Sequence, residues 1–212
     1  MDIAHTLALT LGVGWASGIN LYAAMLTLGF LGATGQMTLP PGLEVLSSPL
    51  VMAAAGLMYV VEFFTDKVPG VDTAWDTLQT FVRIPAGAIL AAGAVSDIGP
   101  AAELAAGLVG GTLATGSHAT KAGTRVMINA SPEPFTNWAA SVGEDVAVVA
   151  GLWTALNHPW LFLCLLAGFI LLMAWLLPKI WRGVKKVFAA LARLLGRRPA
   201  PHHEKDESGP SP

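Results

Sequence analysis

The sequence predicts an all-α integral membrane protein of about six transmembrane helices, because of its composition, its long apolar runs and the placement of its cations. Of the 212 residues, 54% are hydrophobic and 12% are charged, whereas soluble globular domains carry roughly 25% charged residues. So few charges cannot cover a soluble surface, and the apolar residues lie in long runs rather than in amphipathic stripes. Lipid is therefore the expected solvent.

Six apolar runs follow one another along the chain, and together they predict a polytopic domain over residues 1–178. A helical span needs about 20 residues, or fewer where flanking side chains reach the interface. The first run lacks the positively charged start of a secretory signal, so we expect it to be retained as a span. The predicted spans are residues 5–33, 49–65, 78–97, 101–119, 138–157 and 159–178.

The cations predict the orientation, because cytoplasmic loops carry an excess of Lys and Arg. With six alternating spans all 12 cations fall on one side, and the other side receives Glu44, Asp97 and Glu103. We therefore expect a multi-pass protein of the inner membrane with both termini in the cytoplasm. The cations are Lys67, Arg83, Lys121, Arg125, Lys179, Arg182, Lys185, Lys186, Arg193, Arg197, Arg198 and Lys205.

Residues 179–198 predict a basic amphipathic cytoplasmic helix, because apolar residues recur at helical spacing with cations between them. Such a helix binds the lipids of an anionic inner leaflet, or it only fixes the topology. Residues 199–212 combine Pro, Ser and charge without periodicity, which predicts a disordered tail.

Residues 49–97 and 101–157 resemble each other in layout and predict two repeated helical hairpins. Each has a short Ala/Gly-rich span, a cation (Lys67 or Lys121), a Pro-bearing loop, a Trp and then a charge inside the next apolar run. Repeats of this kind commonly enclose a site at their interface. The alternative is a pair of re-entrant hairpins that do not cross fully, which is allowed where protein buries the backbone.

Small residues at four-residue spacing predict close helix packing, either within the chain or in a homodimer. They are Gly14 and Gly18, Gly87 and Ala91, and Gly107 and Gly111.

Arg83, Glu144 and Asp145 lie inside apolar runs, and intramembrane charges usually face a bundle interior or a wet cavity. One hypothesis is that Arg83 faces one of these carboxylates across the repeat axis, forming a polar centre that binds or gates a small polar solute or a lipid headgroup. The alternative is that Arg83 extends back to the cytoplasmic headgroups.

Glu62, Asp66, Asp72 and Asp76 form the densest acidic segment of the chain. Pairs of carboxylates at helical spacing can hold a divalent cation or relay protons. They can equally cap helices and pair with Lys67. Together with Lys67, we expect them to form the cytoplasmic entrance of the site.

His118, Lys121, Arg125 and Asn129 follow one another at spacings of three to four residues, which predicts one polar helix face that attracts anions. Asn20 lies in the middle of the first run, where a hydrogen bond between helices is the usual reason for an Asn.

Several chemistries have no motif in the sequence. There is no His-Glu-x-x-His motif, no Gly-x-Ser-x-Gly elbow and no phosphate-binding glycine loop. The single Cys164 excludes an intrachain disulfide and a cysteine-based zinc site. We expect no cofactor and no bound metal. Nucleic acid is not an expected partner, since the cations follow one membrane face.

Two segments carry a resemblance to a known family. They are Ser17 to Tyr22, and the run Asp66-Lys67-Val68-Pro69 with Val71-Asp72, Trp75-Asp76, Thr80 and Arg83. In these motifs the chain resembles the bacterial and plant membrane proteins of DUF4126, a domain of unknown function, over most of residues 1–160. The resemblance implies a small multi-span membrane protein and brings no established activity. Arg83 beside Pro85-Ala86-Gly87 is also similar to repeat-built lipid-carrier flippases.

These observations favour a small transporter, channel or lipid-carrier translocase with a polar intramembrane site. The alternative is a non-catalytic membrane scaffold whose small-residue faces and basic helix recruit partners. A third reading is a membrane enzyme that acts on lipid headgroups with a metal held by Asp72 and Asp76.

Overall fold

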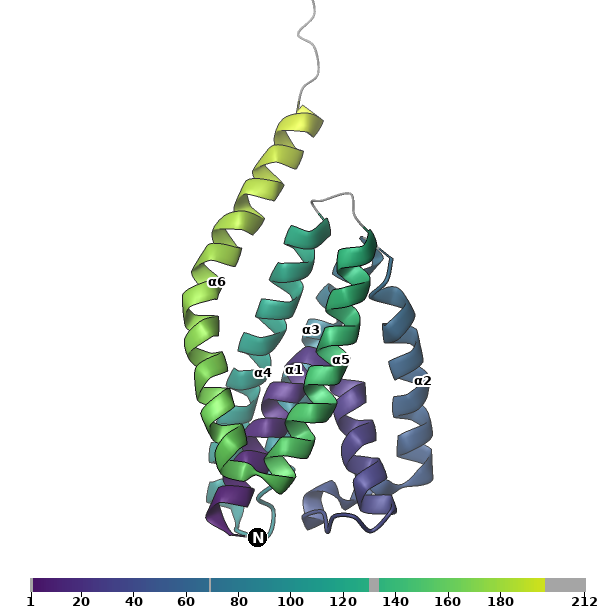
Figure 1. The fold of residues 1–212 in the computed structure, drawn as a ribbon, viewed down its shortest axis with the longest axis vertical. Coiled ribbons are helices and arrows are strands. Elements are labelled where there is room, and N and C mark those ends of the chain that lie inside the picture. Colours follow the sequence, from purple (N-terminus) through teal and green to yellow (C-terminus); the bar gives the residue numbers. More distant parts are fainter. Residues whose placement is uncertain (1, 69, 130–133, 197–212) are drawn as a thin grey trace, which may run out of the picture.

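The computed structural model describes residues 2–68, 70–129 and 134–196, and these ranges form one bundle of helices without a strand (Figure 1). The predicted all-helical class is confirmed. Most of the helices begin at a proline, since Pro suits the first turn, where its missing N–H is not needed. The elements are α1 (Ile3–Ala33), the 3-10 helix η1 (Pro41–Ser47), α2 (Pro49–Thr65), α3 (Val71–Gly93), α4 (Pro100–Asn129), α5 (Pro134–Asn157) and α6 (Pro159–Gly196).

Three of the described helices are long and apolar enough to cross a membrane, namely α1, α5 and α6. The pair η1 and α2, bent by 69°, is a fourth candidate. Helix α3 begins before the predicted run 78–97, and α4 ends after the predicted run 101–119, because both helices include polar residues that lie outside the apolar pattern. The number of spans and the internal repeat stay predictions.

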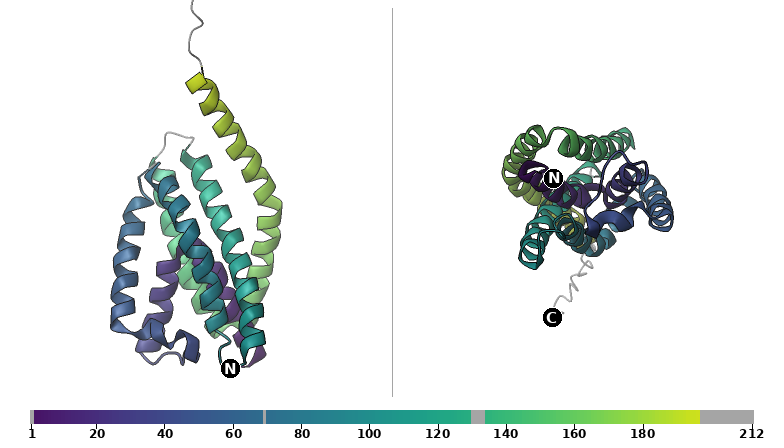
Figure 2. Two further views of the ribbon diagram at one scale, coloured as in Figure 1. Left: turned by 180° about the vertical axis from the view of Figure 1, so that it is seen from behind. Right: turned by 90° about the horizontal axis from the view of Figure 1, so that it is seen from below.

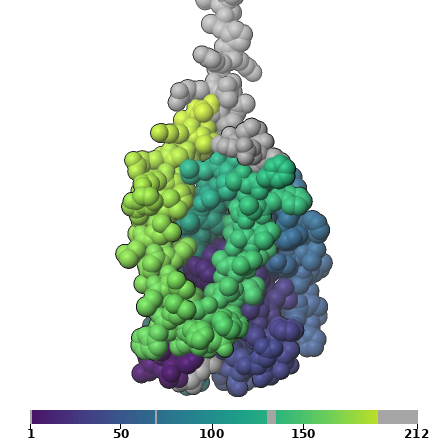
Figure 3. All heavy atoms as spheres, viewed as in Figure 1, coloured from purple at the N-terminus to yellow at the C-terminus, as the bar shows by residue number. Residues whose placement is uncertain are grey.

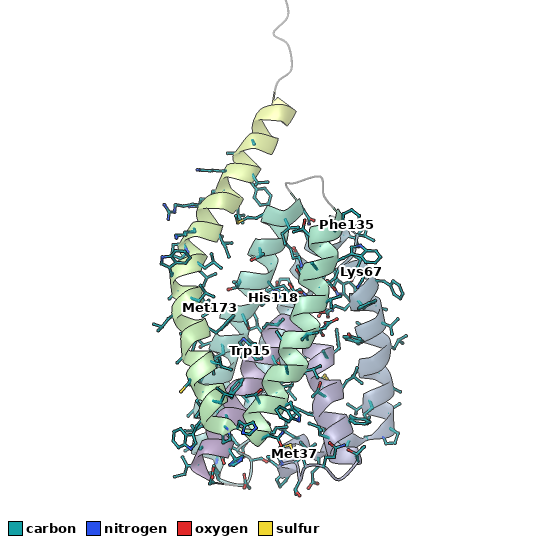
Figure 4. The ribbon with its side chains drawn as sticks, in the orientation of Figure 1. Trp15, Met37, Lys67, His118, Phe135 and Met173 are labelled. Carbon is teal, nitrogen blue, oxygen red and sulfur yellow. The ribbon has the colours of Figure 1, made fainter. Side chains whose placement is uncertain are left out.

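Helix α1 does not run straight through the bundle. Asn20 has φ −145° and ψ 98°, which is extended backbone in the middle of the helix, and the chain turns back there (Figure 1). Both arms of α1 consequently end at the same end of the bundle, where Ile3 and Pro40 line one cavity together with Asp97. Met37, which follows α1, lies at that end as well (Figure 4).

Helices α2 to α6 each run the length of the bundle in alternating directions (Figures 1 and 2). The described N-terminal end and the end of α6 therefore lie at opposite ends of the molecule. This path does not fit the expected six straight crossings with both termini on one side. The predicted and observed paths differ because α1 folds back at Asn20. The sequence did not reveal this turn, since an apolar run has the same composition whether it is straight or folded back.

The arms of α1 pack closely against α3 and α4 through small residues. A methyl group on Gly14 would come within 2.7 Å of the Gly110 Cα atom, and one on Gly18 would collide with Ala114 and Ser117. The predicted glycine contacts are thus used inside the chain. The half of the bundle that contains the N-terminus has an apolar core around these contacts, and this core includes Leu9.

Helix α6 continues without a break through Pro178 to Gly196 and projects beyond the other helices (Figure 1). The basic segment that begins at residue 179 is helical, as expected, but it extends the preceding helix instead of starting a new one. The predicted disordered tail, residues 199–212, lies outside the described residues. Figure 3 shows a hollow between α5 and α6, floored by α1, and Trp15 lines it with Gly151.

Candidate functional site

The half of the bundle beyond the tip of α1 contains a buried network of ion pairs, here called the charged cluster. It joins α2, α3, α4 and α5, and six of its seven side chains are at most 3% exposed. The seventh, Glu144, is 18% exposed. The members are Glu62, Asp66, Asp76, Arg83, Lys121, Arg125 and Glu144.

Arg83 of α3 is completely buried and forms ion pairs with two carboxylates of the first hairpin. Its Nη2 donates to Glu62 Oε1 at 2.6 Å, and its Nη1 donates to Asp76 Oδ1 at 3.2 Å. The expected pairing of Arg83 with Glu144 or Asp145 is wrong, because closer carboxylates on α2 and on its own helix satisfy the guanidinium. Extension to the headgroups is excluded as well, since the side chain has no exposed surface.

Lys121 of α4 lies at the centre of the charged cluster. Its Nζ lies 2.9 Å from Asp66 Oδ2, 3.2 Å from Glu62 Oε1 and 3.3 Å from Glu144 Oε2. Asp76 Oδ1 is more distant, at 3.8 Å. One ammonium group thus links three helices to α4, which follows from its three rotatable donors.

Arg125, one helical turn further along α4, joins the first hairpin to α5. It donates to Glu144 Oε2 at 2.7 Å and to the Asp66 backbone carbonyl at 3.0 Å. It also donates to the backbone carbonyl of Asn137 at 3.2 Å. Arg125 was predicted to lie on the polar helix face with Lys121, but it was not among the expected site residues. Its one-turn spacing from Lys121 was the signal that it would share the same partners.

His118 lies in the bundle interior (Figure 4) and connects the charged cluster to Thr80. Its Nδ1 is 3.3 Å from Arg83 Nη1, and its Nε2 is 2.8 Å from Thr80 Oγ1. Because a guanidinium only donates, Nδ1 must be the acceptor and Nε2 carries the proton. Thr80 in turn donates to the backbone carbonyl of Asp76. These roles describe a neutral imidazole.

Asn20 holds the tip of α1 beneath the charged cluster. Its Oδ1 accepts from the Ala23 N–H at 2.9 Å, which caps the second arm. Its Nδ2 donates to Asp145 Oδ1 at 2.8 Å, and Tyr59 donates to Asp145 Oδ2 at 2.9 Å. The expected hydrogen bond between helices is therefore present. Tyr59 was missed, since a Tyr in an apolar run carries no signal of its own.

Two further expected site residues, Asp72 and Lys67, form no hydrogen bond or ion pair with the charged cluster within the described residues. Asp72 is buried and accepts from Asn129 at 2.7 Å and from the Gly70 N–H at 2.9 Å, so it secures the start of α3. Lys67 is partly exposed and donates to the Phe63 carbonyl at 2.9 Å. Partial burial lowers the pKa of the Lys67 ammonium group. The capping alternative holds for Asp72, whereas the other acids form ion pairs.

Three carboxylate oxygens in the charged cluster have no hydrogen-bond partner among the described residues. They are Glu62 Oε2, Asp66 Oδ1 and Asp76 Oδ2. Within the same residues no group of three or more His, Cys, Asp or Glu has the geometry to hold a metal ion. The arrangement is therefore one of interleaved cations and carboxylates with unused acceptor capacity.

A family model described as "Domain of unknown function (DUF4126)" matches residues 7–179, a range that includes the whole charged cluster and the break at Asn20. The chain belongs to this family. The resemblance carried by Ser17 to Tyr22 and by Asp66 to Arg83 is thus confirmed. In this DUF4126 chain, the motif from Ser17 to Tyr22 forms the tip of α1, and the motif from Asp66 to Arg83 forms one side of the charged cluster. The chain matches no curated protein and no solved structure.

Proposed function

We propose that the chain is a small membrane transporter in which a polar solute passes the charged cluster. The single observation that carries this proposal is a network of seven charged side chains between helices, six of them buried, next to a helix broken at Asn20. Intramembrane charges are expensive and usually mark substrate or ion pathways. Broken helices commonly form such sites, because their ends offer unpaired backbone groups and partial charges.

The break in α1 brings two helix ends to one place. The first arm ends and the second arm begins at Asn20, whose side chain donates a hydrogen bond to Asp145. Glu144, next in sequence, is the most exposed member of the charged cluster. A solute that enters between α2 and α5 would meet Asp145 and Tyr59 first. Their oxygens and the surplus of carboxylates favour a cationic or hydrogen-bond-donating solute over an anion.

The positions of the cations favour one orientation of the chain in the inner membrane. Lys67 and the basic half of α6 lie at the end of the bundle opposite the N-terminus, and cytoplasmic surfaces carry the excess of Lys and Arg. The C-terminal end of α6 is then cytoplasmic and the N-terminus is on the other side.

Untargeted metabolite and lipid profiling tests the transport function without presupposing a substrate. Cells that overproduce the protein are compared with cells that overproduce Glu144→Gln, which keeps the shape of the side chain and removes its charge. The matched control is Glu44→Gln, an exposed position in η1 at the far end of the bundle. We expect wild type and Glu44→Gln to shift the same polar metabolites, and Glu144→Gln to lose the shift. Equal profiles for all three proteins would contradict the proposal.

A scaffold remains the second candidate, because the basic half of α6 projects beyond the bundle and is free to bind anionic lipids or a second copy of the chain (Figure 1). Removal of residues 182–212 separates the two functions. A scaffold loses its partners on purification, whereas a transporter keeps its metabolite shift.

A further inference from the structure

The charged cluster contains one carboxylate more than it has cations. Three cations, Arg83, Lys121 and Arg125, face four carboxylates. If all seven groups are ionised, the network has a net formal charge of −1. An uncompensated buried charge is so unfavourable that the group binds a proton instead.

Among the residues that the structure describes, neighbouring groups do not supply the missing positive charge. His118 cannot, because its Nδ1 already accepts from Arg83 and a proton there would point at a guanidinium. Asp145 and Asp72 add further carboxylates that accept from neutral donors. Lys67 is turned away, with its Nζ 2.9 Å from the centre of the Phe63 ring.

Among the four carboxylates, Asp76 has the weakest ionic contacts. Its Oδ1 is 3.2 Å from Arg83 and 3.8 Å from Lys121, and its Oδ2 has no partner among the described residues. Glu62 has a contact of 2.6 Å, Asp66 one of 2.9 Å and Glu144 one of 2.7 Å. Protonation of Asp76 therefore weakens the ion pairs of the network less than protonation of any other of its carboxylates. The Asp76 side chain is 1% exposed.

We infer that the charged cluster is a proton-binding site, in which Asp76 holds one exchangeable proton per chain. A hydronium ion delivers the proton to Asp76 Oδ2, leaving water and a neutral carboxyl group. Glu144 provides the access from solvent, since it is the one partly exposed carboxylate of the network and shares Lys121 with Asp76. This proton is a property of the resting protein, so it exists whether or not a solute is carried.

Infrared spectroscopy of the full-length protein in lipid nanodiscs at neutral pH tests the site, because protonated and ionised carboxyl groups absorb separately. The wild type is expected to show one more protonated carboxyl group per chain than Asp76→Asn, with its band shifting in heavy water. Asp97→Asn, an exposed position between α3 and α4, is the matched control and keeps the band.

Glu62→Gln provides a second, independent arm. It leaves Asp76 in place but balances three cations with three carboxylates, so Asp76 ionises and the band disappears. A purely structural role for Asp76 does not predict this loss, and the arm still decides the matter if Asp76→Asn does not fold. The proposal is overturned if the wild type has no such band, or if a folded Asp76→Asn or Glu62→Gln protein retains it.

Discussion

The two halves of the bundle are filled in different ways, and the difference comes from the length of α1. In the half that contains the N-terminus, the two arms of α1 occupy the interior and pack through residues such as Gly14 and Leu9. The two arms of α1 meet at Asn20 and do not enter the other half of the bundle. The interior of that half contains the charged cluster. A half-length hairpin therefore leaves space that α2 to α5 fill with charge.

Each half depends on a different kind of complementarity. The apolar half needs close approach of backbones, which small residues allow. The charged half needs every cation to have its carboxylates, since removal of one partner leaves a buried charge without compensation. Substitutions in the two halves should consequently lower the free energy of unfolding for different reasons and by different amounts.

The largest effect is expected for Lys121→Met in the charged half. The change leaves Glu62, Asp66 and Glu144 with fewer cations and should lower the free energy of unfolding by about 3–5 kcal/mol. Denaturant unfolding in detergent micelles measures it. Lys186→Met, an exposed position on α6, is the control. Equal stability of the two variants would mean that the charged half tolerates unpaired acids.

Gly18→Ala tests the apolar half. The new methyl group would collide with Ala114 and Ser117 of α4, so the arm must move and the free energy of unfolding should fall by about 1–3 kcal/mol. Gly168→Ala, where a methyl group meets nothing within 4 Å among the described residues apart from the adjoining backbone of its own helix, should be neutral or mildly stabilising. A tolerated Gly18→Ala would show that the arm of α1 is not packed as described.

Asn20→Ala acts at the boundary between the halves. It removes the cap of the second arm and the hydrogen bond to Asp145, and a lost cap lowers stability by about 1 kcal/mol. Asn157→Ala at the exposed end of α5 is the comparison variant. Thermal unfolding should distinguish the two, and identical midpoints would argue against a capping role for Asn20.

The smallest effect is expected for Asp76→Asn, although this residue is as buried as Lys121. The change replaces a neutral, protonated carboxyl group by a neutral amide of the same shape, so the free energy of unfolding should change by less than about 1 kcal/mol. A loss as large as that of Lys121→Met would contradict the charge count of the cluster.

The sequence predicted much of what each half contains but not how the parts meet. Composition identified the helices, and the spacing of Lys121 and Arg125 placed both on one face. Arg83 was predicted to be an intramembrane charge that pairs with α5, yet its partners lie on α2 and α3, because the choice of partner depends on tertiary packing. The break at Asn20 was also invisible, since hydropathy averages over the residues on either side.

Helix bounds failed for a related reason. The predicted runs ended where polar residues began, whereas α3 and α4 continue through Asp72, Asp76 and Arg125. Those residues are compatible with a buried helix only because they pair with one another. The prolines that open most of the helices were a better guide to where each helix starts.

The turn of α1 at Asn20 decides whether the two halves exist at all, and labelling with a membrane-impermeant thiol reagent tests it directly. Single cysteines are introduced as Ile3→Cys, Gln36→Cys and Lys185→Cys in a Cys164→Ser background. With α1 folded back, Ile3→Cys and Gln36→Cys are labelled from one side of the membrane and Lys185→Cys from the other. Labelling of Ile3→Cys from the same side as Lys185→Cys would mean that α1 crosses the membrane, and would contradict this architecture.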